Sequence, residues 1–362
     1  MTNEKAFPRR GTRESLFSAK GRITVPFELI RNDITKMNVD AIVNSANPRP
    51  IIGGGVDGAI HRAAGATLIA ARRKIGDILT GEAFITPGFD LPAHYVIHTV
   101  GPVWQDGKHG EPDLLRAAYL SSLRLAREHG CKTVAFPLIS AGIFGCPVEV
   151  ALETAVGAIS EYVLRHDMTV YLVVFDRKSF QRSGHLFDDV RAYIDENYAV
   201  RAAARDMRTA EEEPIFEVRR PRGAEAKPPR RLIGLGAGTA SSLGRWLGRR
   251  DETFSERLMH YIDAKGFKDP EVYKRANIDR KLFSKIRSNS DYQPRKSTAL
   301  ALSVALCLSL DETRDLLERA GYALSHSSKA DLIVEYFITR EKYDIFIINQ
   351  ALFSFEQPTL GS

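Results

Sequence analysis

Short apolar runs alternate with longer segments of helical periodicity between Ile23 and Val200, and this alternation ends near residue 251. Such a rhythm is typical of an α/β domain in which helices cover both faces of a largely parallel sheet. The expected strands are 23–30, 41–44, 83–86, 95–100, 133–138 and 169–175, and the expected helices are 56–64, 113–128, 147–164 and 186–196. The sequence therefore predicts an α/β domain over residues 1–200.

Beyond residue 251 the strand pattern stops and short helical segments with capping residues take its place. Asp269 offers an N-cap before Pro270, and Asp279 offers a second N-cap before a basic helix. The expected helices are 254–265, 270–276, 280–288, 295–308 and 311–320, followed by two more at 329–338 and 343–353. These segments predict a second, all-α domain over residues 251–362.

The net charge of +6 is concentrated in one segment of the chain. Residues 1–218 carry 26 basic and 27 acidic side chains, residues 219–250 carry nine and one, and residues 251–362 carry 16 and 17. The basic segment is rich in Pro, Gly, Ser and Arg and lacks a sustained apolar period, as is typical of a mobile connection. We therefore expect a basic flexible linker at residues 201–250.

Composition excludes several classes of protein. With 44% hydrophobic and 27% charged residues, the chain is not disordered, collagenous or a coiled coil. The longest uncharged apolar stretch, 297–310, is shorter than the roughly 20 residues that span a bilayer, and the first 22 residues lack the apolar core of a secretory signal. Three separated cysteines give neither a disulfide framework nor a thiolate zinc site. We expect a cytoplasmic protein with no membrane contact, metal or cofactor.

A glycine-rich loop follows the second expected strand and opens a helix. Gly53, Gly54 and Gly55 let the backbone approach a ligand closely, and free amides at a helix N-terminus attract phosphate. A second loop of this kind, Ser140–Gly145, also lies between a strand and a helix. Two such loops at neighbouring strand ends are suited to holding a diphosphate, although a tight turn without ligand is the alternative for the first.

Other phosphate motifs fit this loop less well. Gly53, Gly55 and Gly58 satisfy the spacing of a dinucleotide fingerprint, with Asp77 as the ribose-binding acid. The next apolar strand begins only at Ala83, which is too late for a compact strand–helix–strand unit of about 30 residues. No Gly-Lys-Ser/Thr sequence occurs, so a Walker loop is excluded.

The motifs, taken in order, resemble those of macrodomains of the MacroD type over about residues 22–197. They are Asn32-Asp-Ile-Thr35, Asp40-Ala-Ile-Val-Asn-Ser-Ala-Asn47, Gly53-Gly-Gly-Val-Asp-Gly-Ala-Ile-His-Arg-Ala-Ala-Gly65, Thr80-Gly-Glu-Ala83, Tyr95-Val-Ile-His-Thr-Val-Gly-Pro102 and Phe136-Pro-Leu-Ile-Ser-Ala-Gly-Ile-Phe-Gly145. The resemblance implies a three-layer α/β/α domain with one ADP-ribose cleft. It also implies a hydrolase that removes single ADP-ribose groups from acidic side chains or deacetylates O-acetyl-ADP-ribose.

The resemblance also assigns ligand-binding positions. Asp33 matches the acid that bonds the adenine amino group, with the amide of Ile34 beside it, and Phe175 resembles the aromatic residue that faces adenine. The two loops that would enclose the diphosphate and distal ribose contain Gly53, Gly54, Gly55 and Val56, and Ser140, Ala141, Gly142, Ile143 and Phe144. The expected partner is ADP-ribose or an ADP-ribosylated protein.

Catalysis is assigned to two residues near the scissile bond, Asp57 and Asn47. Cleavage at the anomeric carbon has oxocarbenium-like character, so a carboxylate such as Asp57 can activate water and stabilise positive charge, while Asn47 holds a ribose hydroxyl or the water. A helix N-cap is the alternative role for Asp57. His61 is interpreted as a packed or capping residue, and Cys146 has no evident partner that would make it a nucleophile.

One departure from the family pattern concerns the first loop. Ile52 replaces a glycine, and Pro48 and Pro50 stiffen the segment after Asn47. A less adaptable loop favours the alternative that the protein is an ADP-ribose reader without turnover. A third hypothesis is a regulator in which ADP-ribose tunes the helical domain.

The helical domain more coarsely resembles the lambda-repressor-like helix-turn-helix domains. Asn277 lies in the turn between the second and third helices, where it can adopt a left-handed conformation. The resemblance places five residues toward DNA, namely Arg280, Lys281, Ser284, Lys285 and Arg287. The domain's net charge of −1 is weak for a DNA binder, so a protein partner, dimerisation and a scaffolding role all stay open.

Overall fold

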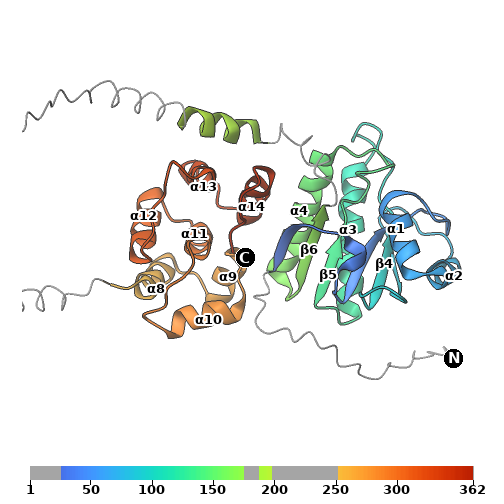
Figure 1. Cartoon of the computed structure of the whole chain (residues 1–362), viewed down its shortest axis with the longest axis horizontal. Coiled ribbons are helices and arrows are strands. Elements are labelled where there is room, and N and C mark those ends of the chain that lie inside the picture. Colours follow the sequence, from blue (N-terminus) through green and yellow to red (C-terminus); the bar gives the residue numbers. More distant parts are fainter. Residues whose placement is uncertain (1–25, 175–186, 198–251, 362) are drawn as a thin grey trace, which may run out of the picture.

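The computed structural model describes residues 26–174, 187–197 and 252–361. The predictions for strand residues 23–25, for Phe175 and for the linker at 201–250 lie outside these ranges, as do the domain boundaries near 200 and 251. The described chain forms a sheet-containing half and a helical half, which lie side by side in Figure 1.

Six strands form one mixed sheet. They are β1 (Phe27–Arg31), β2 (Ala41–Ser45), β3 (Ala83–Pro87), β4 (Tyr95–Thr99), β5 (Thr133–Phe136) and β6 (Thr169–Val174). Their order is β1-β6-β5-β2-β4-β3, and every pair is parallel except β3 with β4. The expected parallel sheet therefore carries one antiparallel edge strand, because β3 returns beside β4 after a short connection rather than through a helix.

Helices cover both faces of the sheet and make three layers. The helices are α1 (Gly55–Ala64), α2 (Ala66–Ile75), α3 (Glu111–Glu128) and α4 (Val148–Arg165), with a 3-10 turn, η1, at Ile34–Lys36. Alternate strand residues enter different cores: Ile42 packs with Ile60 and Leu68 of α1 and α2, whereas Val43 packs in the core that contains α3 and α4. The α/β/α layering agrees with the sequence prediction, which however missed α2.

The helical half contains seven helices within residues 252–361. They are α8 (Phe254–Lys265), α9 (Asp269–Arg275), α10 (Arg280–Ser288), α11 (Lys296–Ala305), α12 (Leu310–Arg319), α13 (Lys329–Thr339) and α14 (Ile345–Ser354). Asp279 caps α10 as expected, accepting from the amide of Lys281 at 2.6 Å. Asp269 is the first residue of α9 rather than its N-cap, which is Lys268. No helix in the described ranges combines the length and the apolar character needed to cross a bilayer.

The two halves share one apolar core along β1 and α4. Phe27 of β1 lies 5.7 Å, ring centre to ring centre, from Phe346 of α14, and both side chains are buried. Lys274 of α9 pairs with Asp167, just after α4, at 3.1 Å. The helical half is therefore packed against the edge of the sheet.

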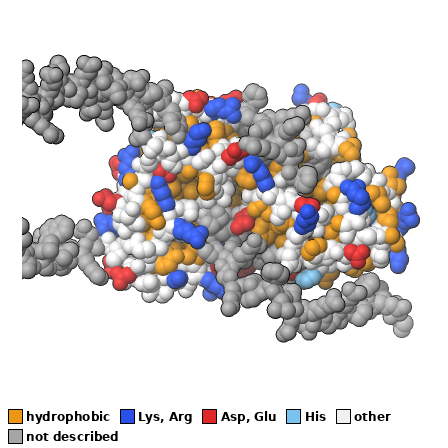
Figure 2. Space-filling view, in the orientation of Figure 1, with side chains coloured by type: hydrophobic (Ala, Val, Ile, Leu, Met, Phe, Trp, Pro, Cys, Tyr) orange, Lys and Arg blue, Asp and Glu red, His pale blue; other side chains and the backbone are white. Residues whose placement is uncertain are grey.

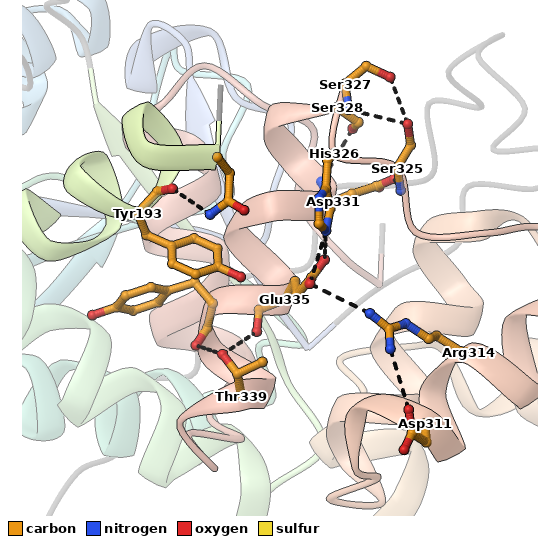
Figure 3. A network of polar contacts seen from close by, with 12 residues as sticks. Tyr193, Asp311, Arg314, Ser325, His326, Ser327, Ser328, Asp331, Glu335 and Thr339 are labelled. Carbon is orange, nitrogen blue, oxygen red and sulfur yellow. Dashed lines mark hydrogen bonds and ion pairs between the residues drawn. The ribbon is translucent and has the colours of Figure 1, made fainter. Parts of the chain in front are cut away.

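A polar network in the helical half joins α12, α13 and the loop between them (Figure 3). The buried carboxylate of Glu335 lies 3.0 Å from Nε2 of His326 and 3.8 Å from the guanidinium of Arg314. Tyr193, from the helix at 188–197, packs its ring 5.4 Å from that of Tyr336 on α13. The contact between Tyr193 and Tyr336 connects the sheet-containing half to α13.

Candidate functional site

A cavity of about 700 Å³ opens at the carboxyl ends of β1, β2, β5 and β6. The residues that line it include all but one of the predicted ligand-binding and catalytic residues, namely Asp33, Ile34, Asn47, Gly53, Gly54, Gly55, Val56, Asp57, Ser140, Ala141, Gly142, Ile143 and Phe144. The remaining one, Phe175, lies outside the described residues. Ligands of α/β sheets bind at this end of the strands, so the cavity is the candidate site.

The first glycine loop forms one wall of the cavity. Helix α1 begins at Gly55, and its N-cap, Gly54, has no side chain to satisfy the amides of the first turn. Gly55 has a φ of 56°, which a side chain would disfavour. The N-terminus of α1 therefore offers uncapped amides and the positive end of the helix dipole to an anion in the cavity.

Asp57 is fixed at both carboxylate oxygens. The amide of Gly53 donates to Oδ2 at 2.5 Å, and the side-chain amide of Asn44 donates to Oδ1 at 2.6 Å. The carboxylate is buried but lines the cavity. Asp57 is not the N-cap of α1; it lies in the first turn and holds the loop before the helix. Asp57 therefore has a fixed orientation and borders the cavity.

His61 lies one turn after Asp57 on α1. Its Nε2 is 3.5 Å from Oδ1 of Asp57, and the side chain is buried. Burial lowers the pKa of His61, an effect that the Asp57 carboxylate opposes and the Arg72 guanidinium reinforces. His61 does not line the cavity, in agreement with its interpretation as a packed residue.

Asn47 is held in place by a buried arginine that sequence reasoning missed. The side-chain amide of Asn47 donates to the carbonyl of Ile51 at 3.2 Å. The guanidinium of Arg72 donates to the carbonyls of Asn47 and Pro48 at 3.1 and 3.0 Å, and also to that of Gly76. Arg72 is only 2% exposed although it lies in a basic run on α2. In the sequence, Arg72 stands in a basic run and is indistinguishable from a solvent-exposed arginine.

The second loop forms the opposite wall. Ser140 adopts a left-handed φ of 62°, and its hydroxyl donates to the carbonyl of Pro102 at 2.8 Å. A Cβ on Gly101 would lie 2.2 Å from that hydroxyl, so this glycine permits the close approach. Ile143 is 81% exposed and reaches across the cavity to Gly54, where a Cβ would lie 3.1 Å from its Cδ1. The two loops therefore nearly meet over the site.

The other end of the cavity is formed by the turn after β1. Asp33 caps η1 and accepts from the amide and the hydroxyl of Thr35 at 3.0 and 2.7 Å. The hydrogen bond from the Thr35 hydroxyl lowers the pKa of Asp33, which keeps the carboxylate ionised near neutral pH. An ionised, half-buried acid is a suitable acceptor for an exocyclic amine.

Cys146 borders the second loop and is buried. Burial raises the pKa of its thiol to about 11. A thiol with this pKa is almost fully protonated near neutral pH and is a poor nucleophile.

One cluster outside the cavity has the composition of a metal site. Asp106, His109 and Glu111 lie close together in the described chain. The Glu111 carboxylate already accepts from the amides of Gln105, Gly107 and His109. Burial would raise the pKa of Glu111, but hydrogen bonds from its own backbone amide and from these three amides lower it to about 2. The cluster therefore stabilises a loop.

The residues predicted to face DNA lie on one exposed helix. Arg280, Lys281, Ser284, Lys285 and Arg287 of α10 are all exposed, while Phe283 and Ile286 are buried. Arg287 pairs with Asp269, and Lys285 lies over the ring of Tyr292 at 5.4 Å. Figure 2 shows basic and acidic side chains interspersed over the visible face of both halves rather than one basic field.

Comparison with known proteins identifies the family of this chain. The Macro domain family model matches residues 43–155. The chain is 56% identical over 146 residues to a Macro domain-containing protein of Chlorobaculum tepidum, which covers 40% of this chain and 84% of that protein. It is 49% identical over 166 residues to the O-acetyl-ADP-ribose deacetylase of Escherichia coli K12, which covers 44% of this chain and 92% of the relative. The chain therefore belongs to the Macro domain family.

Proposed function

We propose that the protein is a MacroD-type hydrolase that binds ADP-ribose and cleaves esters attached to its distal ribose. The observation that carries this proposal is the position of Asp57, whose carboxylate is oriented by two hydrogen bonds at the edge of an amide-lined cavity. The similarity to O-acetyl-ADP-ribose deacetylases supports the same class of reaction.

In this proposal, binding and chemistry are carried by different groups. Neutral amides of the two loops take the diphosphate, Asp33 takes the adenine amine, and Phe144 packs against the distal ribose. Asp57 activates or orients water, and Asn47 holds a ribose hydroxyl or that water. For an ADP-ribosylated carboxylate, water attacks the anomeric carbon and the side-chain carboxylate leaves. For the acetyl ester, water attacks the acetyl carbonyl, the bond from that carbon to the ribose oxygen breaks, and acetate and ADP-ribose with a free hydroxyl are released.

A panel of three substrates tests the proposal with the full-length protein. O-acetyl-ADP-ribose, a protein mono-ADP-ribosylated on an acidic residue and an ADP-ribosylated nucleic-acid end present the same ADP-ribose handle. Time-resolved release of product from at least one of them, with substrate in excess, is expected. Saturable binding of ADP-ribose in calorimetry without turnover of any substrate would instead identify a reader, which the exposed Ile52 at the mouth of the loop favours. Absence of both binding and turnover would refute either function.

We propose as a second function that the helical domain, over residues 251–362, is a helix-turn-helix unit that contacts DNA phosphates through α10. Support comes from the four residues that join α9 to α10, with Asn277 at a φ of 51°, and from the exposed cations of α10. We expect binding to duplex DNA that weakens as salt rises. Lys281→Glu should bind DNA more weakly and with a shallower salt dependence. Without salt-dependent binding, α10 serves a protein partner or has a scaffolding role.

A further inference from the structure

A buried histidine lies behind the candidate site, one strand away from it. His98 of β4 is fully buried and stands in register with Asn44 of β2. Its Nδ1 lies 3.3 Å from the amide nitrogen of Asn44, and its Nε2 lies 3.0 Å from the hydroxyl of Thr86 on β3. None of these three side chains lines the cavity. The hydrogen bond from Asn44 to Asp57 connects them to it.

The Asp57 carboxylate, at one end of this series of hydrogen bonds, fixes the direction of every bond in the series. An ionised Asp57 carboxylate only accepts, so Asn44 must present its amide nitrogen. That nitrogen also faces Nδ1 of His98, which must therefore accept, and the ring proton resides on Nε2. Nε2 then donates to Thr86, whose hydroxyl donates in turn to the carbonyl of Val96 at 3.5 Å. The series runs from β3 through β4 and β2 to the site.

Burial keeps the His98 ring neutral. Burial, reinforced by the electrostatic effects of Arg72 and His61, lowers the pKa of His98 to about 3. A protonated ring would carry a hydrogen on Nδ1, directed at the amide hydrogens of Asn44. The neutral ring with its proton on Nε2 is the form that lets Asn44 donate to Asp57.

We propose that His98 is a positioning residue for the reaction, acting through Asn44 on Asp57. The ring fixes the orientation of the Asn44 amide, and that amide fixes Oδ1 of Asp57, while the amide of Gly53 fixes Oδ2. Asp57 is thereby held from two independent parts of the fold, the sheet and the glycine loop. This inference rests on the proposed hydrolase function, since it assigns a role in the same reaction.

Three variants of the full-length protein test the role. His98→Phe keeps a ring but loses both hydrogen bonds, and we expect kcat to fall roughly 10- to 100-fold while the Kd for ADP-ribose changes less than about twofold. Thr86→Val removes the hydrogen bond between Nε2 of His98 and the Thr86 hydroxyl, and should lower kcat about two- to fivefold. His98→Gln retains an acceptor and a donor and should recover most of the activity. Ser122→Ala, which loses a buried hydroxyl on α3 that does not line the cavity, serves as the control.

The outcomes separate a positioning role from a structural one. An unchanged kcat in His98→Phe and Thr86→Val would overturn the proposal, as would equal losses of kcat and ADP-ribose affinity. Nitrogen NMR of the histidine rings in the wild type gives a readout that needs no turnover. We expect a neutral His98 with its proton on Nε2 from about pH 8 to about pH 5. A proton on Nδ1 would overturn the proposal even if His98→Phe does not fold, and a wild type that hydrolyses nothing would refute the hydrolase function by itself.

Discussion

Asn277 pairs with both main-chain polar groups of Phe27, although the two residues lie 250 positions apart. The side-chain amide donates to the carbonyl of Phe27 at 2.7 Å, and its oxygen accepts from the Phe27 amide at 2.9 Å. Asn277 is buried in the turn between α9 and α10, and Phe27 begins the edge strand β1. The turn predicted to serve DNA recognition is thus also the point at which the helical half contacts the sheet.

Asn277→Gly should destabilise the protein without straining the turn. Glycine adopts the φ of 51° readily, so the variant loses only the side chain and leaves the buried polar groups of Phe27 without these partners. We expect the free energy of unfolding to fall by about 2–4 kcal/mol. Urea denaturation measures it, with the exposed Asn289→Ala as the control. Equal stabilities for the two variants would show that the contact contributes little.

Asp57→Ala should affect turnover much more than binding. Removing the carboxylate deletes the group that activates water, and we expect kcat to fall by about 10²- to 10⁴-fold. Asp57→Asn, which keeps the shape, should lose a similar factor. Rates with O-acetyl-ADP-ribose and calorimetry with ADP-ribose provide the two quantities. Unchanged turnover in both variants would remove Asp57 from the mechanism.

Gly53→Ala should disturb both proposed catalytic side chains. A Cβ at this position would lie 2.7 Å from Nδ2 of Asn47 and 3.2 Å from Oδ2 of Asp57, so at least one must move. Because a misplacement of about 1 Å can cost 100-fold, kcat should fall by about that factor. Gly157→Ala is the matched control, since its Cβ meets no atom within 4 Å. Equal values of kcat in the two variants would mean that the loop accommodates the added methyl group without displacing Asn47 or Asp57 from their working positions.

Arg72→Lys should loosen the segment that carries Asn47. Lysine keeps the charge but cannot reach the three carbonyls that the planar guanidinium bonds. We expect a loss of about 1–3 kcal/mol in the free energy of unfolding and a lower kcat. Arg73→Lys, on the exposed side of α2, controls for the substitution. If both variants behave like the wild type, Arg72 does not position this segment.

His98 should make the fold sensitive to acid. The unfolded chain takes up a proton at His98 below about pH 6.5, whereas the folded protein does so only near pH 3, so the unfolded state binds more protons in this interval. The free energy of unfolding should therefore decrease as the pH is lowered, by up to about 1.4 kcal/mol per pH unit from this group. Urea denaturation from about pH 7 to about pH 5 should give a shallower dependence in His98→Phe. The exposed His260→Asn should keep the wild-type slope, and parallel slopes for all three proteins would contradict the assignment.

Local patterns predicted most of the elements and the contents of the cavity. Strand ends, glycines and the resemblance of the motifs placed Asp33, Asp57 and Phe144 around one site, because parallel strands bring their carboxyl ends together. Helix α2 was missed since its basic residues interrupt the apolar stripe, and Arg72 looked like a surface charge. The partners of such residues are set by the tertiary fold.

The contacts between the two halves could not be predicted from the sequence either. The left-handed turn at Asn277 was predicted from its residue type and is confirmed by its φ. Its partner, Phe27, could not be inferred, because the local pattern of neither segment relates two residues that are 250 positions apart in the sequence. The flexible linker and the exact domain boundaries stay predictions.

The pairing at the first residue of β1 has a consequence for self-association. An outermost strand with open amides and carbonyls is a template on which another chain can add a strand. At Phe27 those groups are occupied by a single asparagine side chain, and the adjoining helices cover that margin of the sheet. The helical half therefore blocks the addition of another strand at this residue of β1.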